Sequence, residues 1–233
     1  MAATELVETA DFPTVTLSLY RDIHKGIRAE LFTVTMTAGR VDPSCTADLD
    51  ALAGHVTAVA TMLHEHAEHE DAHIDAPLRT HYPQFAERVG ADHSVLDARI
   101  DGLLERAAEL RTGAAGDRRN RVQGLYMELA SFTSAYLDHQ DFEERIVMPA
   151  VESALGFPGV LTVHEAIIAG IPPEEMARGL AVMLPAMNVD DRTELLGGMQ
   201  AGAPPEVFDR VWGLAASVLE ARDVAALADR LGV

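Results

Sequence analysis

The sequence predicts an all-α protein built on an up-down-up-down four-helix bundle. Aromatic residues make up only 5% of the chain, Ala, Leu and Glu are plentiful, and runs with a two-residue period are scarce, which favours helix over strand. Four long stretches carry apolar residues at three- and four-residue steps, separated by short breaks that contain Gly or Pro. Because short connections make neighbouring helices antiparallel, these stretches predict the bundle.

The four predicted helices span residues 16–38, 46–76, 84–111 and 117–154. Breaks are expected at residues 39–43, at Pro77, at residues 113–116 and at residues 156–158. After Pro158 the stretches shorten, and prolines stand where first helical turns would begin. We therefore expect residues 1–155 to form the bundle and residues 156–233 to form a short helical C-terminal extension, which serves in packing or oligomerisation.

Charge and composition exclude several classes of partner and site. The net charge is −19 and the isoelectric point is about 4.7, so phosphate backbones and anionic lipids are repelled, and we expect neither nucleic acid nor membrane as a partner. Residues 1–13 lack the apolar core of a signal peptide, and no apolar run long enough for a span is evident, which predicts a cytoplasmic protein. Cys45 is the only cysteine, so any metal must be held by His and carboxylate.

Six polar residues occupy positions where the apolar stripes should face the bundle core. The first and third helices each contribute one His, and the second and fourth each contribute an HxxxE pair: His24, His66, Glu70, His93, His139 and Glu143. The single histidines lie near helix starts and the pairs toward helix ends, which places all six at one level of an antiparallel bundle. Since a buried unpaired polar group costs about 1–3 kcal/mol, something must satisfy them.

The donor types point to a pair of transition metals. Four imidazoles and two carboxylates are too many donors for one tetrahedral zinc, and calcium or magnesium would prefer oxygen ligands. Two metals bridged by the carboxylates and a solvent-derived oxygen fit this set, with two Fe ions as the first choice and manganese or zinc as alternatives. The other interpretation is a hydrogen-bonded polar layer without metal.

Neighbouring residues add further candidates. His69 and His73 on the second helix are additional candidate ligands, and the alternative is that they lie on a solvated or outer face. Asp97, one turn beyond the third-helix histidine, is expected to orient a ligand. Tyr20 and Tyr136 lie one turn from His ligands, where they serve as core aromatics or as hydrogen-bond donors to a bound oxygen species.

The order, type and spacing of the six residues resemble the hemerythrin (HHE) cation-binding family over residues 16–154. The resemblance implies that each iron takes two histidines, with Glu70 and Glu143 bridging the pair. Oxygen-carrying hemerythrins use five histidines and an HxxxxD arrangement on the last helix, where this chain has HxxxE. The pattern is closer to the iron-centre repair members, which have four histidines and two glutamates and often carry a cysteine-bearing N-terminal domain that this sequence does not show.

Six protein ligands for two irons would leave coordination positions open for a small molecule. We therefore expect a non-haem di-iron protein that binds and reduces or activates dioxygen, hydrogen peroxide or nitric oxide, as an oxidoreductase or a sensor. One alternative is a non-catalytic oxygen or iron carrier. Another is a scaffold in which the metal only stabilises the bundle and the surface binds a protein.

Overall fold

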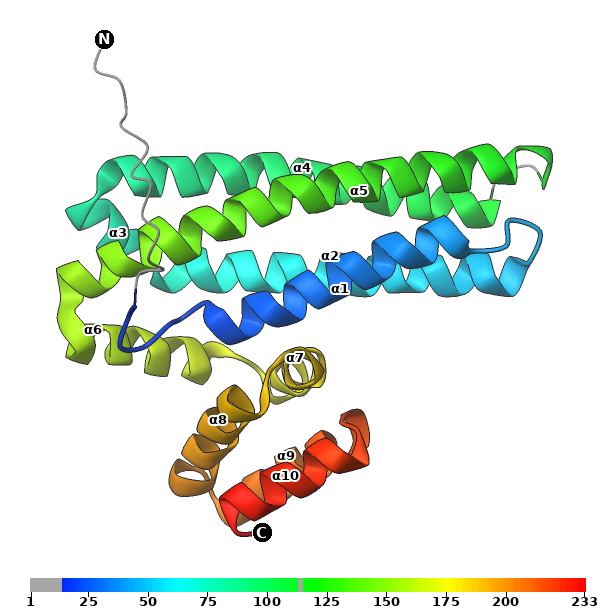
Figure 1. The fold of residues 1–233 in the computed structure, drawn as a ribbon. Helices are drawn as coiled ribbons and strands as arrows, with labels where there is room; N and C mark the ends of the chain where they lie inside the picture. Colours follow the sequence, from blue (N-terminus) through cyan, green and yellow to red (C-terminus); the bar gives the residue numbers. More distant parts are fainter. Residues whose placement is uncertain (1–13, 113–114) are drawn as a thin grey trace.

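The computed structural model describes residues 14–112 and 115–233. Within these ranges the chain is helical, with short connections and no strand (Figure 1). This confirms the all-α prediction. The N-terminal segment 1–13 and the first half of the predicted break at residues 113–116 lie outside the described residues.

Four long helices form the bundle and lie side by side in Figure 1. They are α1 (Arg21–Arg40), α2 (Thr46–His73), α4 (Pro83–Thr112) and α5 (Arg118–Phe142), and the short 3-10 turn η1 (Ala115–Asp117) precedes α5. The predicted apolar stripes supply the core: Ile27, Leu31, Val34, Leu49, Leu52, Val56, Val59, Leu63, Leu96, Ile100, Leu103, Ala107, Leu110, Val122, Leu125, Leu129, Phe132 and Tyr136 are all buried. The predicted bundle is therefore confirmed.

Two helix boundaries differ from the prediction. The first helix begins at Arg21 rather than residue 16, and just before it the Ser18 hydroxyl accepts a hydrogen bond from the Arg21 backbone N–H at 3.0 Å. The second break falls at Ile74, not at Pro77, since Pro77 lies within the first turn of a separate short helix, α3 (Asp75–His81). Proline is tolerated there because first-turn N–H groups have no intrahelical partner.

A π-helical turn, η2 (Glu143–Val147), separates α5 from α6 (Met148–Gly170). The backbone N–H of Met148 donates to the carbonyl of Glu143, five residues back. The extra residue shifts the buried face by one position, so that Val147 is buried whereas Ile146 is 42% exposed. Regular helical spacing after His139 and Glu143 predicts that Ile146 continues the inward stripe, and the π turn makes that prediction wrong. Single π turns inside α-helices occur frequently at functional sites.

Helix α6 bends at Gly156, whose φ of 63° and ψ of 171° are not helical. The predicted break at residues 156–158 is thus a kink, and the division between residues 1–155 and 156–233 falls on it. Beyond the kink, Val160 is buried in a second core cluster with Tyr20 and Leu78, so this half of α6 stays packed on the bundle. The division into two units stays a prediction.

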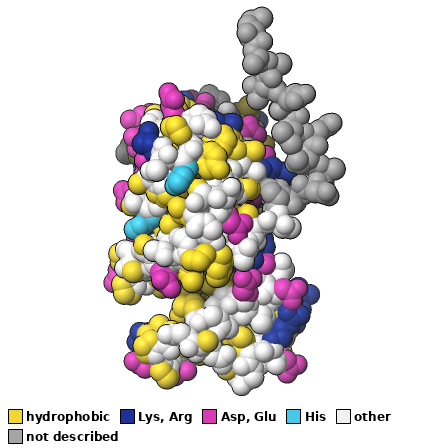
Figure 2. All heavy atoms as spheres, turned by 90° about the vertical axis from the view of Figure 1, so that its left-hand side faces the viewer, with side chains coloured by type: hydrophobic (Ala, Val, Ile, Leu, Met, Phe, Trp, Pro, Cys, Tyr) yellow, Lys and Arg dark blue, Asp and Glu magenta, His cyan; other side chains and the backbone are white. Residues whose placement is uncertain are grey.

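The helical run 118–170 includes a stretch with a mean hydropathy of 1.6 that is 28% buried. Its length and composition would allow it to cross a membrane, a criterion that buried core helices also meet, so the expectation that no apolar run is long enough does not hold. Figure 2 shows hydrophobic side chains gathered on the surface between the bundle and the C-terminal helices. Phe157, Leu161 and Ile168 of α6 are exposed. That no membrane is a partner stays a prediction.

The C-terminal helices are α7 (Pro173–Ala186), α8 (Val189–Gly202), α9 (Pro205–Val218) and α10 (Ala221–Leu231). They enclose a core of their own around Leu180, Leu184, Leu196, Phe208, Ala215 and Leu227. Helix α7 packs along the side of α1, where a Cβ on Gly26 would lie 3.0 Å from Val182 Cγ1. Ion pairs of Lys25 with Asp191 and of Arg21 with Glu194 join α1 to α8. The extension therefore covers the outer side of the helix that carries His24.

Candidate metal centre

The structure brings all six predicted ligand residues into one layer of the bundle. Their ligand atoms form two groups, and within each group all of these atoms lie within 4.8 Å of one another: His24, His66, Glu70 and Glu143 in the first, and Glu70, His93, His139 and Glu143 in the second. Both carboxylates belong to both groups. All four helices of the bundle contribute, and the π turn supplies Glu143 at its first position.

The distances between nitrogen and carboxylate oxygen atoms inside the layer are short, both within a helix and between helices. The Nε2 atom of His66 lies 3.0 Å from Glu70 Oε1, and that of His139 lies 3.2 Å from Glu143 Oε1. Across helices, His93 Nε2 lies 3.3 Å from Glu70 Oε2 and His24 Nε2 lies 3.5 Å from Glu143 Oε2. Each histidine thus directs its Nε2 atom toward the two carboxylates.

Hydrogen bonding does not satisfy this layer. Both carboxylate oxygens of Glu70 and of Glu143, and the Nε2 atom of His93, are buried without a hydrogen-bond partner. Such groups are costly unless something else pairs them. Imidazole nitrogens and carboxylate oxygens that converge in this way are the donor set of a transition metal, so the residues fit a metal site.

The electrostatics of the metal-free layer follow from its burial and its mixed charges. Burial alone would lower the pKa of His24, but Glu144, Glu70 and Glu143 raise it to about 9. Burial would also lower the pKa of His93, but Glu143 and Glu70 outweigh this effect and raise it to about 11. Burial works against ionisation of Glu70, yet His66 and its neighbours hold the pKa of that carboxyl well below its usual range. Without metal, protons on His24 and His93 balance the charge of the carboxylates.

Two tyrosines border the layer. The ring of Tyr20 lies 5.0 Å from that of His24, and the ring of Tyr136 lies 5.8 Å from that of His139. Burial, and then the charges of the two glutamates, raise the pKa of both phenols well above the usual value. Both therefore remain protonated at neutral pH, as hydrogen-bond donors.

The additional candidate ligands lie elsewhere. His69 faces the extension, with its Nε2 atom 2.5 Å from Glu175 Oε1 on α7. His73 faces the end of α6, since a Cβ on Gly170 would lie 3.5 Å from its Nε2 atom. Asp97, expected to orient a ligand, has its Oδ1 atom 3.7 Å from His64 Nε2. Neither His69 nor His73 belongs to either ligand group among the described residues.

Other carboxylates lie on the outer side of the candidate ligand histidines, a position that the sequence did not predict for them. The Nδ1 atom of His24 lies 3.0 Å from Glu144 Oε1, and that of His93 lies 3.0 Å from Asp71 Oδ1. Asp92 Oδ2 lies 3.7 Å from the Nδ1 atom of His139. These three acids share one signal in the sequence, because each directly precedes or follows a ligand residue.

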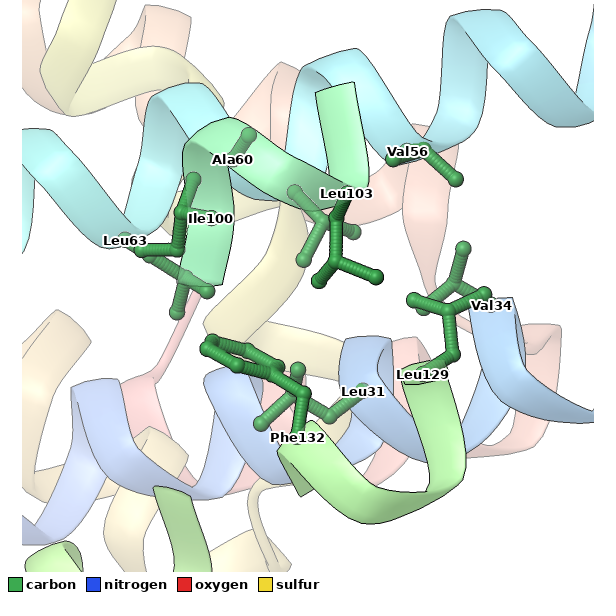
Figure 3. A pocket seen from close by; sticks show the side chains of 10 residues that line it. Leu31, Val34, Val56, Ala60, Leu63, Ile100, Leu103, Leu129 and Phe132 are labelled. Carbon is green, nitrogen blue, oxygen red and sulfur yellow. The ribbon is translucent and has the colours of Figure 1, made fainter. Parts of the chain in front are cut away.

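A small apolar cavity lies in the bundle core, away from the ligand layer (Figure 3). Its volume is about 10 Å³, roughly the space needed for one water-sized sphere. Side chains from all four bundle helices line it: Leu31, Val34, Val56, Val59, Ala60, Leu63, Ile100, Leu103, Leu129 and Phe132. The six candidate ligands are not among these side chains. Leu31, Ile100 and Phe132 each lie about two turns along their helix from His24, His93 and His139.

Fold and site together define a helical-bundle protein with a buried histidine and carboxylate site for metal. The Hemerythrin HHE cation binding domain matches residues 15–151, which is more than half of the chain, and the chain belongs to this family. A search of curated proteins and a search of solved structures each returned no significant match.

Proposed function

We propose that this protein holds two iron ions and that it binds and reduces or activates a small molecule, namely dioxygen, hydrogen peroxide or nitric oxide. The observation that carries the proposal is the sharing of Glu70 and Glu143 by both ligand groups. Two groups with common carboxylates are the arrangement expected of a bridged metal pair. Four imidazoles and two carboxylates leave room for an exogenous ligand on each metal.

An iron pair bound there would supply electrons by changing between ferrous and ferric states. The chain's own part is to hold the pair and to keep bulk water away from it. His24, Glu143 and His139 are almost completely buried, and the apolar cluster of the bundle closes one side of the layer. Burial also strengthens every electrostatic contact inside the site.

The two tyrosines support a role with oxygen- or nitrogen-containing small molecules. Protonated phenols beside the carboxylate layer can donate hydrogen bonds to such a molecule.

Kinetics with matched tyrosine variants would test this function. Iron-loaded, reduced protein would be mixed separately with each of the three molecules while its visible spectrum is followed. Tyr136→Phe removes a phenol beside the site, whereas Tyr126→Phe removes one that lies against Gly39, far along the bundle. We expect the visible spectrum to change on mixing with at least one of the three molecules. Tyr136→Phe should alter the rate of this spectral change, whereas Tyr126→Phe should not.

The alternative is a non-catalytic protein that binds or senses oxygen or iron. It is supported by the same buried ligand set, which holds metal whether or not turnover follows. Reversible spectral change on adding and removing oxygen, with negligible consumption of peroxide, would favour it. Repeated turnover with peroxide, or with nitric oxide and a reductant, would favour the redox function.

A further inference from the structure

The candidate ligand histidines differ in the carboxylate that faces the Nδ1 atom, on the side of the ring away from the metal layer. A partner that accepts the outer N–H of a metal-binding imidazole fixes the ring and makes its other nitrogen a better donor. His24 has Glu144 at 3.0 Å from its Nδ1 atom, and His93 has Asp71 at 3.0 Å. The Nδ1 atom of His139 lies 3.7 Å from the carboxylate of Asp92 and is buried without a hydrogen bond.

Glu144 is the most firmly held of these acids. The Arg28 guanidinium donates two hydrogen bonds to it, from Nη1 to Oε1 at 2.7 Å and from Nη2 to Oε2 at 3.1 Å. Such two-point contacts fix a carboxylate in direction as well as in place. The Glu144 side chain is only 16% exposed, and His24 is completely buried. Little water therefore screens the contact between them.

The acids behind the second group are held more loosely. The Asp71 side chain is 59% exposed, so water screens its charge and competes for its oxygens. Asp92 also has an arginine neighbour, Arg88, but the two lie 3.7 Å apart, and the Arg88 guanidinium lies over the Phe142 ring. The two groups thus have matching inner ligands and unequal outer support.

We propose that Glu144 is a positioning residue that makes the two metal positions unequal, so that the position of His24 and His66 binds metal more tightly than that of His93 and His139. Glu144 does this by fixing the orientation of the His24 imidazole and by making its Nε2 atom a stronger electron-pair donor to the metal. The proposal rests on the proposed metal-binding function. The inequality predicts that metal ions occupy the position of His24 and His66 first.

Calorimetric titration of the metal-free protein with Co²⁺ tests this inequality. We expect two steps in the wild type. Glu144→Gln keeps the size of the side chain but removes its charge, and should weaken the tighter step about 10–100-fold, as loss of an outer partner does. Asp71→Asn is the matched control, because its exposed carboxylate contributes less, and it should leave the tighter step unchanged.

Single ligand variants assign the steps. His139→Ala should keep the tighter step and His66→Ala should lose it. Arg28→Gln, which frees Glu144 while changing a partly exposed residue, should weaken the same step to a smaller extent, and it remains informative if Glu144→Gln fails to fold. The proposal is overturned if Glu144→Gln and Arg28→Gln leave the tighter step unchanged, if both steps weaken equally, or if His139→Ala removes the tighter one. Absence of Co²⁺ and iron binding in the wild type would instead overturn the metal function itself.

Discussion

The Nε2 atoms of His24 and His66 lie 3.1 Å apart, although the two residues come from separate helices and are 42 positions apart in the chain. Two imidazole nitrogens at this distance need either a shared proton or a common metal. Because Glu70 and Glu143 face the same atoms, the common metal accounts for all four side chains at once.

Loss of a shared carboxylate should cost more metal than loss of a histidine. Glu143→Ala removes a ligand of both groups, so we expect the iron content to fall by more than one ion per chain. His139→Ala affects one group and should lose about one ion. Elemental analysis of purified protein measures both. His64→Ala, whose imidazole faces Asp97, should retain the wild-type content, and a loss there would contradict the assignment.

His69 should prove dispensable for metal binding. Its imidazole is engaged with Glu175 of the extension, so His69→Ala should keep the full metal content and weaken only the contact between α2 and α7. A partly exposed ion pair of this kind is worth at most about 1 kcal/mol. Iron content and thermal unfolding of the variant are the measurements. Loss of iron with unchanged stability would show that His69 is a ligand after all.

Close packing between α1 and α7 should make Gly26 sensitive to a single methyl group. A Cβ at Gly26 would lie 3.0 Å from Val182 Cγ1 and 3.3 Å from the Met183 backbone, so Gly26→Ala should push the extension outward and lower the stability by about 1–3 kcal/mol. Gly54→Ala, on α2 with nothing within 4 Å of its Cβ position, is the control. That change should raise stability by up to about 1 kcal/mol through helix propensity. Urea unfolding of the two variants should therefore move in opposite directions.

The metal-free protein should lose stability as the pH rises. The pKa of His24 is raised to about 9 from its ordinary 6.5, so its contribution is fully present below about pH 6.5 and disappears as the pH passes 9. His93, with its pKa raised to about 11, extends the loss to higher pH. For His24 alone the linkage corresponds to up to about 3 kcal/mol. Urea midpoints of the metal-free protein at about pH 6 and pH 9.5 measure it, and a higher midpoint at the alkaline pH would contradict this charge balance.

The sequence was sufficient to predict the bundle and the inward positions of the six candidate ligands, because both depend on helical periodicity. Residues such as Leu63 and Ile100 mark the stripe, and the ligands continue it at the same spacing. Ile146 was misplaced because a π turn inserts one residue after Glu143, and no residue in that turn marks it in advance. Periodicity alone therefore predicts a regular helix through Glu143, where the structure has a π turn.

The residues behind the ligands were harder to foresee. The contact between Arg28 and Glu144 spans 116 positions in the chain and depends on how α1 meets η2. Helical spacing suggested Asp97 as the orienting acid, whereas the structure places Asp71 behind His93. Side chains on the flank of a helix depend on the neighbouring helix, which periodicity within a single helix does not describe.

A di-iron centre can be tested by the iron content of the wild-type protein after expression in iron-supplemented medium, measured by elemental analysis together with its visible spectrum. The shared carboxylates predict about two irons per chain, with charge-transfer bands that change when peroxide is added. One metal per chain, zinc alone, or no metal would contradict a di-iron centre and would leave the six inward residues as the site of another metal or as a polar layer.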